Sequence, residues 1–478
     1  MIQETNELIL GIDLNPDYTQ VTYYHQSVRE PMTLGGDERS QLMPAGMRQD
    51  ENGIWSLWDG TSETIGDSAG RDAKQIFVGE AGASADKTWM NGGEKPSVGM
   101  SQMNGGGRSS ADTLQPDGGM NPGGYSVARV WESILQSVSG DNGEDVELPM
   151  GRDELLAAYL KLCIAGLKLL TSDTTLSVMV TVKNLTETQN QVIVDALMRF
   201  GVDRKKIYVQ DYLSSFFYYV INQKKELWLQ DVALLTYEEE SMVGYVLHID
   251  RSTRPAIARV TEAARQPVTE EVRANRSDED WRREKDRLFF ELLKKVFERR
   301  TIAVSYLFGD YFDQSWTKRS IQFLCSGRRA YQGMNLYSRG ACYAAMERTG
   351  ILGGGEILFG GGDMLQRNLG MEMSIRGKES YYPLVNAGVN WYEAHHSCEF
   401  ILHGEREIRL VSQPMTPGAP VIHSMRLPGL PKRPDRATRL RMTIYYTSAA
   451  CCHVEVEDLG FGGLYKSSQL TWSRDIRF

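Results

Sequence analysis

The spacing of apolar residues changes near residue 353, and this change constrains the fold most strongly. Before it, β-rich runs alternate with helical periodicity, as in the succession 177–182 (strand), 186–200 (helix) and 206–210 (strand). Such alternation predicts a substantially parallel sheet covered by helices. After residue 365 stretches such as 438–446 ("TRLRMTIYY") alternate apolar and polar residues with a period of two, and long helical patterns disappear. The sequence therefore predicts an α/β region over residues 1–352, a glycine-rich linker over 353–365 and an all-β sandwich over 366–478.

Further elements of the α/β region follow from the same patterns. The clearest helix spans 277–299, where Ser277 is suited to cap the first turn and three acidic residues suit the positive end of the helix dipole. Other helices are expected at 152–170, 211–222 and 338–347, and other strands at 8–14, 20–24, 231–236 and 302–307. Residues 91–124 contain ten glycines and few β-branched residues, which indicates an exposed loop or insertion.

Composition narrows the range of partners and compartments. A net charge of −9 gives no reason to expect nucleic acid or an anionic membrane as a partner. No apolar run reaches the roughly 18–20 residues that a membrane helix needs. The first residues include Glu4 and Glu7 and lack the basic start of a signal peptide. The six cysteines are scattered, which favours reduced thiols over disulfides, and we expect a cytoplasmic protein.

Two turns carry the chemistry that decides function. The first follows Gly11-Ile12-Asp13-Leu14 and reads Asn15-Pro16-Asp17, in a frame typical of a phosphate-binding hairpin. Such a hairpin needs glycines, whose backbone N–H groups approach the phosphate oxygens, whereas proline deletes a donor. The second turn contains Glu238, Glu239 and Glu240. One carboxylate at 4 Å from a phosphate charge costs about 4 kcal/mol at an effective dielectric near 20, so both turns disfavour polyphosphate.

The order of these parts resembles the heat-shock protein 70 (DnaK-type) chaperones within the actin-like ATPase superfamily. Gly11–Leu14, Thr64–Ala69, Val178–Gln191, Gly201–Val220 and Ser305–Asp310 are similar to successive motifs of their ATPase domain. Gly362–Glu372 and Thr443–Asp458 resemble their peptide-binding β domain, and we expect no counterpart of their helical lid. The resemblance implies a two-lobed, ribonuclease H-like ATPase domain followed by a β-sandwich.

The resemblance also implies where a nucleotide would lie. The positions are Asp13, Asn15 and Asp17 on the phosphate side, and Gly309, Asp310, Gly340 and Ala341 on the adenosine side. Asp13 is open to a second interpretation, a structural acid at the start of a hairpin. Gly340-Ala341 could equally mark close packing at a helix start, and Glu238–Glu240 could form a solvated acidic turn or bind a cation. ATP with Mg²⁺ is possible under this resemblance, but the turns argue against it.

No other pattern supports catalysis or a metal site. His395-His396-Ser397-Cys398 has suitable residue types but fits no zinc spacing, and no G-x-S-x-G motif occurs. Residues 427–436 ("LPGLPKRPDR") predict an ordered loop before a strand, with a peptide ligand as the alternative.

The hypothesis is a heat-shock-70-like pseudo-ATPase with a chaperone-like or scaffolding role, which binds a protein or an extended peptide segment without efficient ATP hydrolysis. The degenerate turns favour a protein that is not an enzyme, and the sequence leaves that question open. Two alternatives stay open: an active ATP-dependent chaperone, and an actin-like filament or cell-division scaffold.

Overall fold

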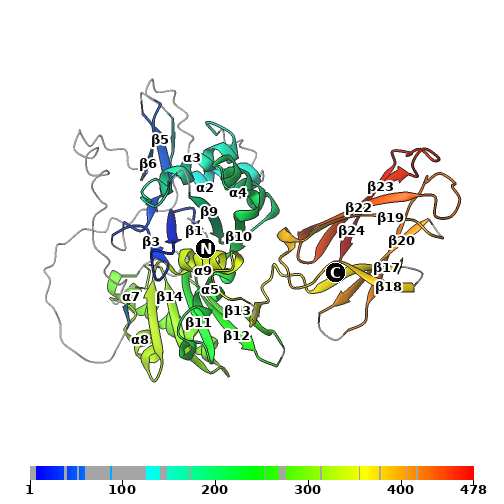
Figure 1. Ribbon diagram of the computed structural model, residues 1–478. Coiled ribbons are helices and arrows are strands. Elements are labelled where there is room, and N and C mark those ends of the chain that lie inside the picture. Colours follow the sequence, from blue (N-terminus) through cyan, green and yellow to red (C-terminus); the bar gives the residue numbers. More distant parts are fainter. Residues whose placement is uncertain are drawn as a thin grey trace. The chain divides into compact units, whose positions relative to one another are not determined.

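The computed structural model describes most of the chain as two compact units (Figure 1). The described residues are 7–36, 40–50, 53–59, 87–88, 125–139, 148–171, 174–238, 240–252, 254–268, 276–309, 311–312, 315–354, 356–375, 378–404, 406–415 and 418–478. The first unit comprises Met1–Asn184, Val192–Leu247 and Thr261–Gly353. The second comprises Leu185–Gln191, His248–Val260 and Gly354–Phe478. The predicted loop 91–124 and the motif 64–69 lie outside the described residues.

One sheet of the first unit has the strand order β10-β9-β1-β2-β3. Its strands are β1 (Glu7–Leu14), β2 (Tyr18–Tyr24), β3 (Met32–Thr33), β9 (Thr175–Val182) and β10 (Ile207–Asp211), and β4 (Met43–Pro44) pairs with β2. Strand β1 runs antiparallel to β2 and parallel to β9, which runs parallel to β10. The β1–β2 hairpin and the parallel β9–β10 pair confirm the corresponding sequence predictions.

A second sheet repeats this arrangement with the order β15-β14-β11-β12-β13. Its strands are β11 (Asp231–Glu238), β12 (Ser241–Asp250), β13 (Ala256–Pro267), β14 (Ile302–Phe308) and β15 (Arg329–Gly333). Strand β11 is antiparallel to β12 and parallel to β14, which is parallel to β15. At the ends of this order β7 (Lys87–Thr88) joins β15, and β16 (Ile357–Phe359) pairs with β13. Both sheets thus contain three strands that are consecutive in the chain, the first two of which form a hairpin. Two parallel strands lie next to the first of these three.

Helices connect these strands (Figure 1). Their bounds are α2 (Val130–Ser139), α3 (Arg152–Ile164), α4 (Glu187–Arg199), α5 (Tyr212–Ile221), α7 (Asp278–Phe297), α8 (Lys318–Cys325) and α9 (Leu336–Arg348). Helix α7 begins as predicted, because the Ser277 side chain accepts a hydrogen bond from the backbone N–H of Asp280. The predicted helix 152–170 is too long: α3 ends at Ile164, and turns follow at Gly166, a poor helix former.

Short elements complete the description. Strands β5 (Gly46–Gln49), β6 (Trp55–Trp58) and β8 (Ser126–Val127) form a three-stranded sheet. Single 3-10 turns occur at Arg204–Lys206, Lys225–Leu227 and Trp391–Glu393. Among the helices described, none is long and apolar enough to cross a membrane.

The second unit contains two four-stranded antiparallel sheets that share one core. The first sheet has the order β18-β17-β20-β21 and the second β19-β22-β23-β24. Their bounds are β17 (Arg367–Ile375), β18 (Lys378–Val385), β19 (His395–Ile401), β20 (Glu407–Pro414), β21 (Val421–Arg426), β22 (Arg439–Ser448), β23 (Cys451–Gly460) and β24 (Thr471–Arg477). The predicted inward face of β22 is confirmed, since Leu440, Met442, Ile444 and Tyr446 are all buried in that core.

Candidate functional site

The carboxyl end of β1 places Asp13 in the interior of the first unit. Its side chain has an exposed fraction of 0%. The hydroxyl of Tyr212 donates a hydrogen bond of 2.6 Å to Oδ1, and the hydroxyl of Tyr18 approaches Oδ2 at 3.4 Å. Tyr212 reaches this point because it begins α5, where the Asp211 side chain caps the helix by accepting a hydrogen bond from the backbone N–H of Ser214. Both carboxyl oxygens therefore face phenolic hydroxyls.

Burial dominates the electrostatics of this pair. It raises the pKa of Asp13 to about 7, although the hydrogen bonds from Tyr212 and Tyr18 act in the opposite direction. Burial also raises the pKa of Tyr212 well above its ordinary value, and the neighbouring Asp13 carboxyl adds to that shift. Tyr212 thus stays protonated and acts as the donor. A carboxyl that titrates near neutrality is a candidate acid or base, but here the hydroxyl of Tyr212 occupies one of its oxygens.

Three aromatic rings form a column beside Asp13. The ring of Tyr212 stacks on that of Tyr337, with centroids 4.0 Å apart and planes at 12°. The ring of Phe308 also contacts that of Tyr337, with centroids 4.2 Å apart and planes tilted by 46°. Tyr337 comes from the first turn of α9 and Phe308 from the end of β14. The column, defined as Tyr212, Tyr337 and Phe308, therefore runs from the first sheet of this unit to the second.

The turn after β1 uses its polar groups internally. The Asn15 side-chain amide donates to the hydroxyl of Tyr212 at 3.1 Å, and its carbonyl oxygen accepts from the backbone N–H of Asp17 at 2.9 Å. The exposed carboxylate of Asp17 forms an ion pair with Arg129 at 3.3 Å. The predicted repulsion of anions by Asp17 is therefore weakened by a neighbouring positive charge, while the Asn15 amide is directed toward Tyr212.

Helix α9 makes its closest contacts at glycines. A Cβ atom at Gly340 would lie 1.9 Å from the backbone oxygen of Ser215 in α5. A Cβ atom at Gly11 in β1 would lie 2.2 Å from the backbone nitrogen of Cys342. Ala341 is fully buried. Gly340-Ala341 thus lies where helices α5 and α9 pack closely. The sequence left close packing open as the alternative to a nucleotide contact at these two residues.

The remaining predicted residues lie elsewhere on the first unit. Gly309 follows β14 with φ 101°, a conformation that favours glycine, and its carbonyl oxygen accepts from Gln332 at 3.3 Å. Asp310 and Glu239 fall outside the described residues, Glu238 is described by its backbone as the end of β11, and Glu240 is exposed.

The structure thus brings Asp13 and Asn15 together through Tyr212, a residue that the sequence reasoning missed. Tyr337 and Phe308 were also missed, because they lie just outside the predicted helix 338–347 and the predicted strand 302–307.

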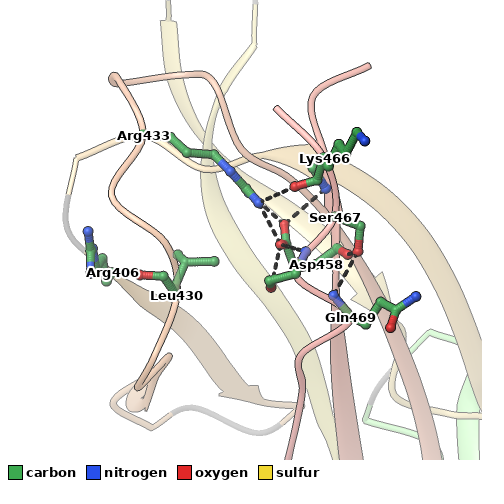
Figure 2. A network of polar contacts seen from close by, with 9 residues as sticks. Arg406, Leu430, Arg433, Asp458, Lys466, Ser467 and Gln469 are labelled. Atoms are coloured by element: carbon green, nitrogen blue, oxygen red, sulfur yellow. Dashed lines mark hydrogen bonds and ion pairs between the residues drawn. The ribbon is translucent and has the colours of Figure 1, made fainter. Parts of the chain in front are cut away.

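The second unit contains a buried ion pair that fastens two loops (Figure 2). Arg433, in the predicted loop 427–436, donates two hydrogen bonds of 2.7 and 2.8 Å to the carboxylate of Asp458 on β23. The exposed fractions of the two side chains are 3% and 0%. Arg433 also donates to the backbone oxygen of Lys466, and Asp458 accepts from the backbone N–H groups of Gly460 and Ser468. The loop 427–436 is therefore held by specific contacts, as an ordered loop requires.

The pKa of Asp458 reflects these contacts. Burial alone would raise it, but the hydrogen bonds from Arg433, Ser468 and Gly460 hold it well below its usual range.

The side chains of His395 to Cys398 point alternately to the two faces of the sheet along β19. These residues pair in register with Tyr445 to Met442 of β22. Across the described part of the chain, no group of three or more histidine, cysteine, aspartate or glutamate side chains could hold a metal ion.

Comparison with known proteins matches two families of unestablished role. A family model described as "Family of unknown function (DUF5716) C-terminal" matches residues 136–359. A second, described as "Domain of unknown function (DUF8552)", matches residues 364–478. No curated protein matches the chain.

Proposed function

We propose that the first unit is a duplicated, two-lobed domain of the actin-like class. The support is topological. In each of the two sheets, three strands that are consecutive in the chain lie side by side, and two parallel strands follow on the side of the first of them. In each sheet the first strand is antiparallel to the second and parallel to the fourth. This repetition agrees with the order of motifs in the sequence. Under this proposal the end of β1 and the turn between β11 and β12 correspond to the two phosphate hairpins.

We infer further that this domain is a pseudo-ATPase. The observation that carries the inference is the enclosure of Asp13, whose exposed fraction is 0% and whose Oδ1 accepts a hydrogen bond from Tyr212. A carboxylate that organises hydrated Mg²⁺ needs room for water around its oxygens. The hydroxyls of Tyr212 and Tyr18 take the positions next to these oxygens instead. Its role is then structural, and the domain serves as a scaffold without efficient ATP hydrolysis.

The second unit is proposed to bind a protein partner through an extended segment. Strand β21 lies at the edge of its sheet, and its Val421 and Ile422 have exposed fractions of 44% and 63%. An edge strand offers backbone groups and alternate side chains to an added strand. One backbone oxygen of this edge, that of Ser424, accepts a hydrogen bond from Arg474 of β24. The start of the strand, at Val421 and Ile422, is therefore the part proposed to receive the segment.

Titration of Mg²⁺-ATP against the full chain tests the pseudo-ATPase proposal. A ligand at 100 times its dissociation constant stabilises the folded state by about 2.7 kcal/mol, which a thermal unfolding scan detects. We expect no saturable rise in melting temperature and no phosphate release above that of heat-treated protein. A competent actin-like ATPase assayed in parallel is the control. A saturable rise would overturn the proposal in favour of an active chaperone, and nucleotide-dependent light scattering would favour the filament alternative.

A further inference from the structure

One end of the sandwich interior is polar and positively charged. Arg367 of β17 lies two residues before Leu369, on the face of the sheet that Leu369 buries in the core. Leu369 is in register with Ser412 of β20, which is in register with Val421 of β21. His423 lies two residues further along β21 on the same face. Adjacent strands therefore place Arg367, Ser412 and His423 together on the inner face.

The contacts of these residues leave one strong donor without an acceptor. The Ser412 hydroxyl and Nε2 of His423 lie 2.9 Å apart, so each satisfies the other. The Nη1 atom of Arg367 is buried, and no described group accepts a hydrogen bond from it. No ion pair of Arg367 occurs within the described residues. A buried guanidinium nitrogen without an acceptor is energetically costly, so the hydrogen bonding of Arg367 is incomplete within the described residues.

Neighbouring groups define the walls of this end of the sandwich. The ring of Phe478 packs edge-on against His423, with centroids 5.9 Å apart, and stacks near Tyr446 at 6.0 Å. The hydroxyl of Tyr446 is also buried without a hydrogen-bond partner. Burial lowers the pKa of His423, and the positive charges of Arg474 and Arg367 lower it further. His423 is thus neutral at neutral pH, and the two charges that act on its pKa, those of Arg474 and Arg367, are positive.

We propose that Arg367, with Ser412 and His423 beside it, forms a site for a carboxylate supplied by a bound peptide segment. The inference rests on the proposed binding of an extended segment by the second unit and names the chemistry of that segment. A carboxylate matches the planar guanidinium and can accept from Nη1. Either an acidic side chain or a peptide C-terminus could supply it. The site lies beside Val421, at the exposed end of β21 where the segment is proposed to bind.

The test uses the full-length protein with its histidine residues isotope-labelled, so that NMR can follow the imidazole signal of His423. The probes are acetyl-Ala-Glu-Ala-amide, acetyl-trialanine with a free C-terminus, neutral acetyl-Ala-Gln-Ala-amide and inorganic phosphate. We expect at least one carboxylate peptide to shift the His423 signal saturably and to raise its titration midpoint, because an anion offsets the nearby positive charge. The two acidic peptides separate a side-chain carboxylate from a C-terminal one. A response to phosphate alone, or an equal response to the neutral peptide, would refute the assignment.

Variants of two arginines complete the test. Arg367→Met is expected to abolish the response and to leave the ligand-free chain as stable or more stable, because it removes a buried nitrogen that has no acceptor. Arg409→Met is the matched control, since Arg409 lies on β20 with an exposed fraction of 60%, in an ion pair with Glu407. It should retain the full response. If Arg367→Met lowers the melting temperature or leaves the response intact, the site is refuted. Binding of ATP by the first unit would leave this result unaffected.

Discussion

At the scale of single residues, Asp13 couples the stability of the first unit to pH. Its pKa is about 7 in the folded chain and 3.8 in a model peptide, so the folded state binds the proton more tightly. Stability from this group is fully present below the unfolded pKa of 3.8 and is lost as pH rises to about 7. The difference between the two pKa values corresponds to at most about 4 kcal/mol.

Replacement of Asp13 by asparagine is predicted to remove this dependence. The neutral amide keeps the acceptor for Tyr212 but does not ionise, so the free energy of unfolding of Asp13→Asn should exceed that of wild type by a margin that grows from acid to neutral pH. Urea unfolding across that range measures the margin. Asp211, whose pKa is also raised by burial, contributes to both profiles and cancels in the difference. Asp17→Asn, at an exposed position, is the control, and parallel profiles for wild type and Asp13→Asn would contradict the prediction.

Gly340 supports a second prediction at this scale. The Cβ atom of Gly340→Ala would lie 1.9 Å from the backbone oxygen of Ser215, so α5 and α9 would have to separate. We expect a loss of about 3 kcal/mol or more in the free energy of unfolding, at the upper end of overpacking effects. Gly36→Ala is the control, because nothing lies within 4 Å of its added Cβ atom. Equal stability of the two variants, measured by chemical denaturation, would show that α9 adjusts freely.

At the scale of elements, the pair Arg433–Asp458 is predicted to fix the loop before β22 and the loop after β23. Arg433→Met leaves a buried carboxylate without its partner and should cost about 3–5 kcal/mol. Arg436→Met, on the same loop with an exposed fraction of 68%, should cost less than about 1 kcal/mol. Because the pKa of Asp458 is depressed on folding, the contribution is present above the unfolded pKa and is lost in acid. Denaturation at neutral pH and in acid checks both points, and a uniform cost at all pH values would disagree.

The elements themselves were largely predictable, whereas their long-range contacts were not. Strand β1 was predicted as 8–14 and observed as Glu7–Leu14. It was predictable because its apolar run ends at a turn. Helix α9 was predicted as 338–347 and begins at Leu336, so Tyr337 was placed in the preceding loop. Tyr212, Tyr337 and Phe308 meet only in the fold, and no spacing rule links them. Arg433 and Asp458 are 25 residues apart, and their pairing likewise leaves no periodic signal.

At the scale of the whole molecule, the two-sheet sandwich of the second unit is predicted to fold without the rest of the chain. The residues of its core cluster all lie between Leu365 and Phe478. Asp363 accepts a hydrogen bond of 2.9 Å from the indole N–H of Trp391. A chain of residues 362–478 should therefore give a cooperative thermal transition by circular dichroism. Leu440→Ala should lower its stability by about 2–5 kcal/mol, whereas Tyr445→Ala, on the opposite face of β22, should have a small effect. A non-cooperative transition would contradict this prediction.

Helix α9 has a consequence for the exchange of amide hydrogens. Its backbone contacts β1 at Gly11 and α5 at Gly340, and its first turn carries the middle ring of the aromatic column. At both glycines the backbones pack directly on each other with no side chain between them. The helix therefore cannot shift locally without losing both contacts. Its amide protons should therefore exchange with deuterium only when the whole first unit opens. Substitutions in that unit should then change the exchange rates along α9 by one common factor, which makes this helix a direct reporter of global unfolding.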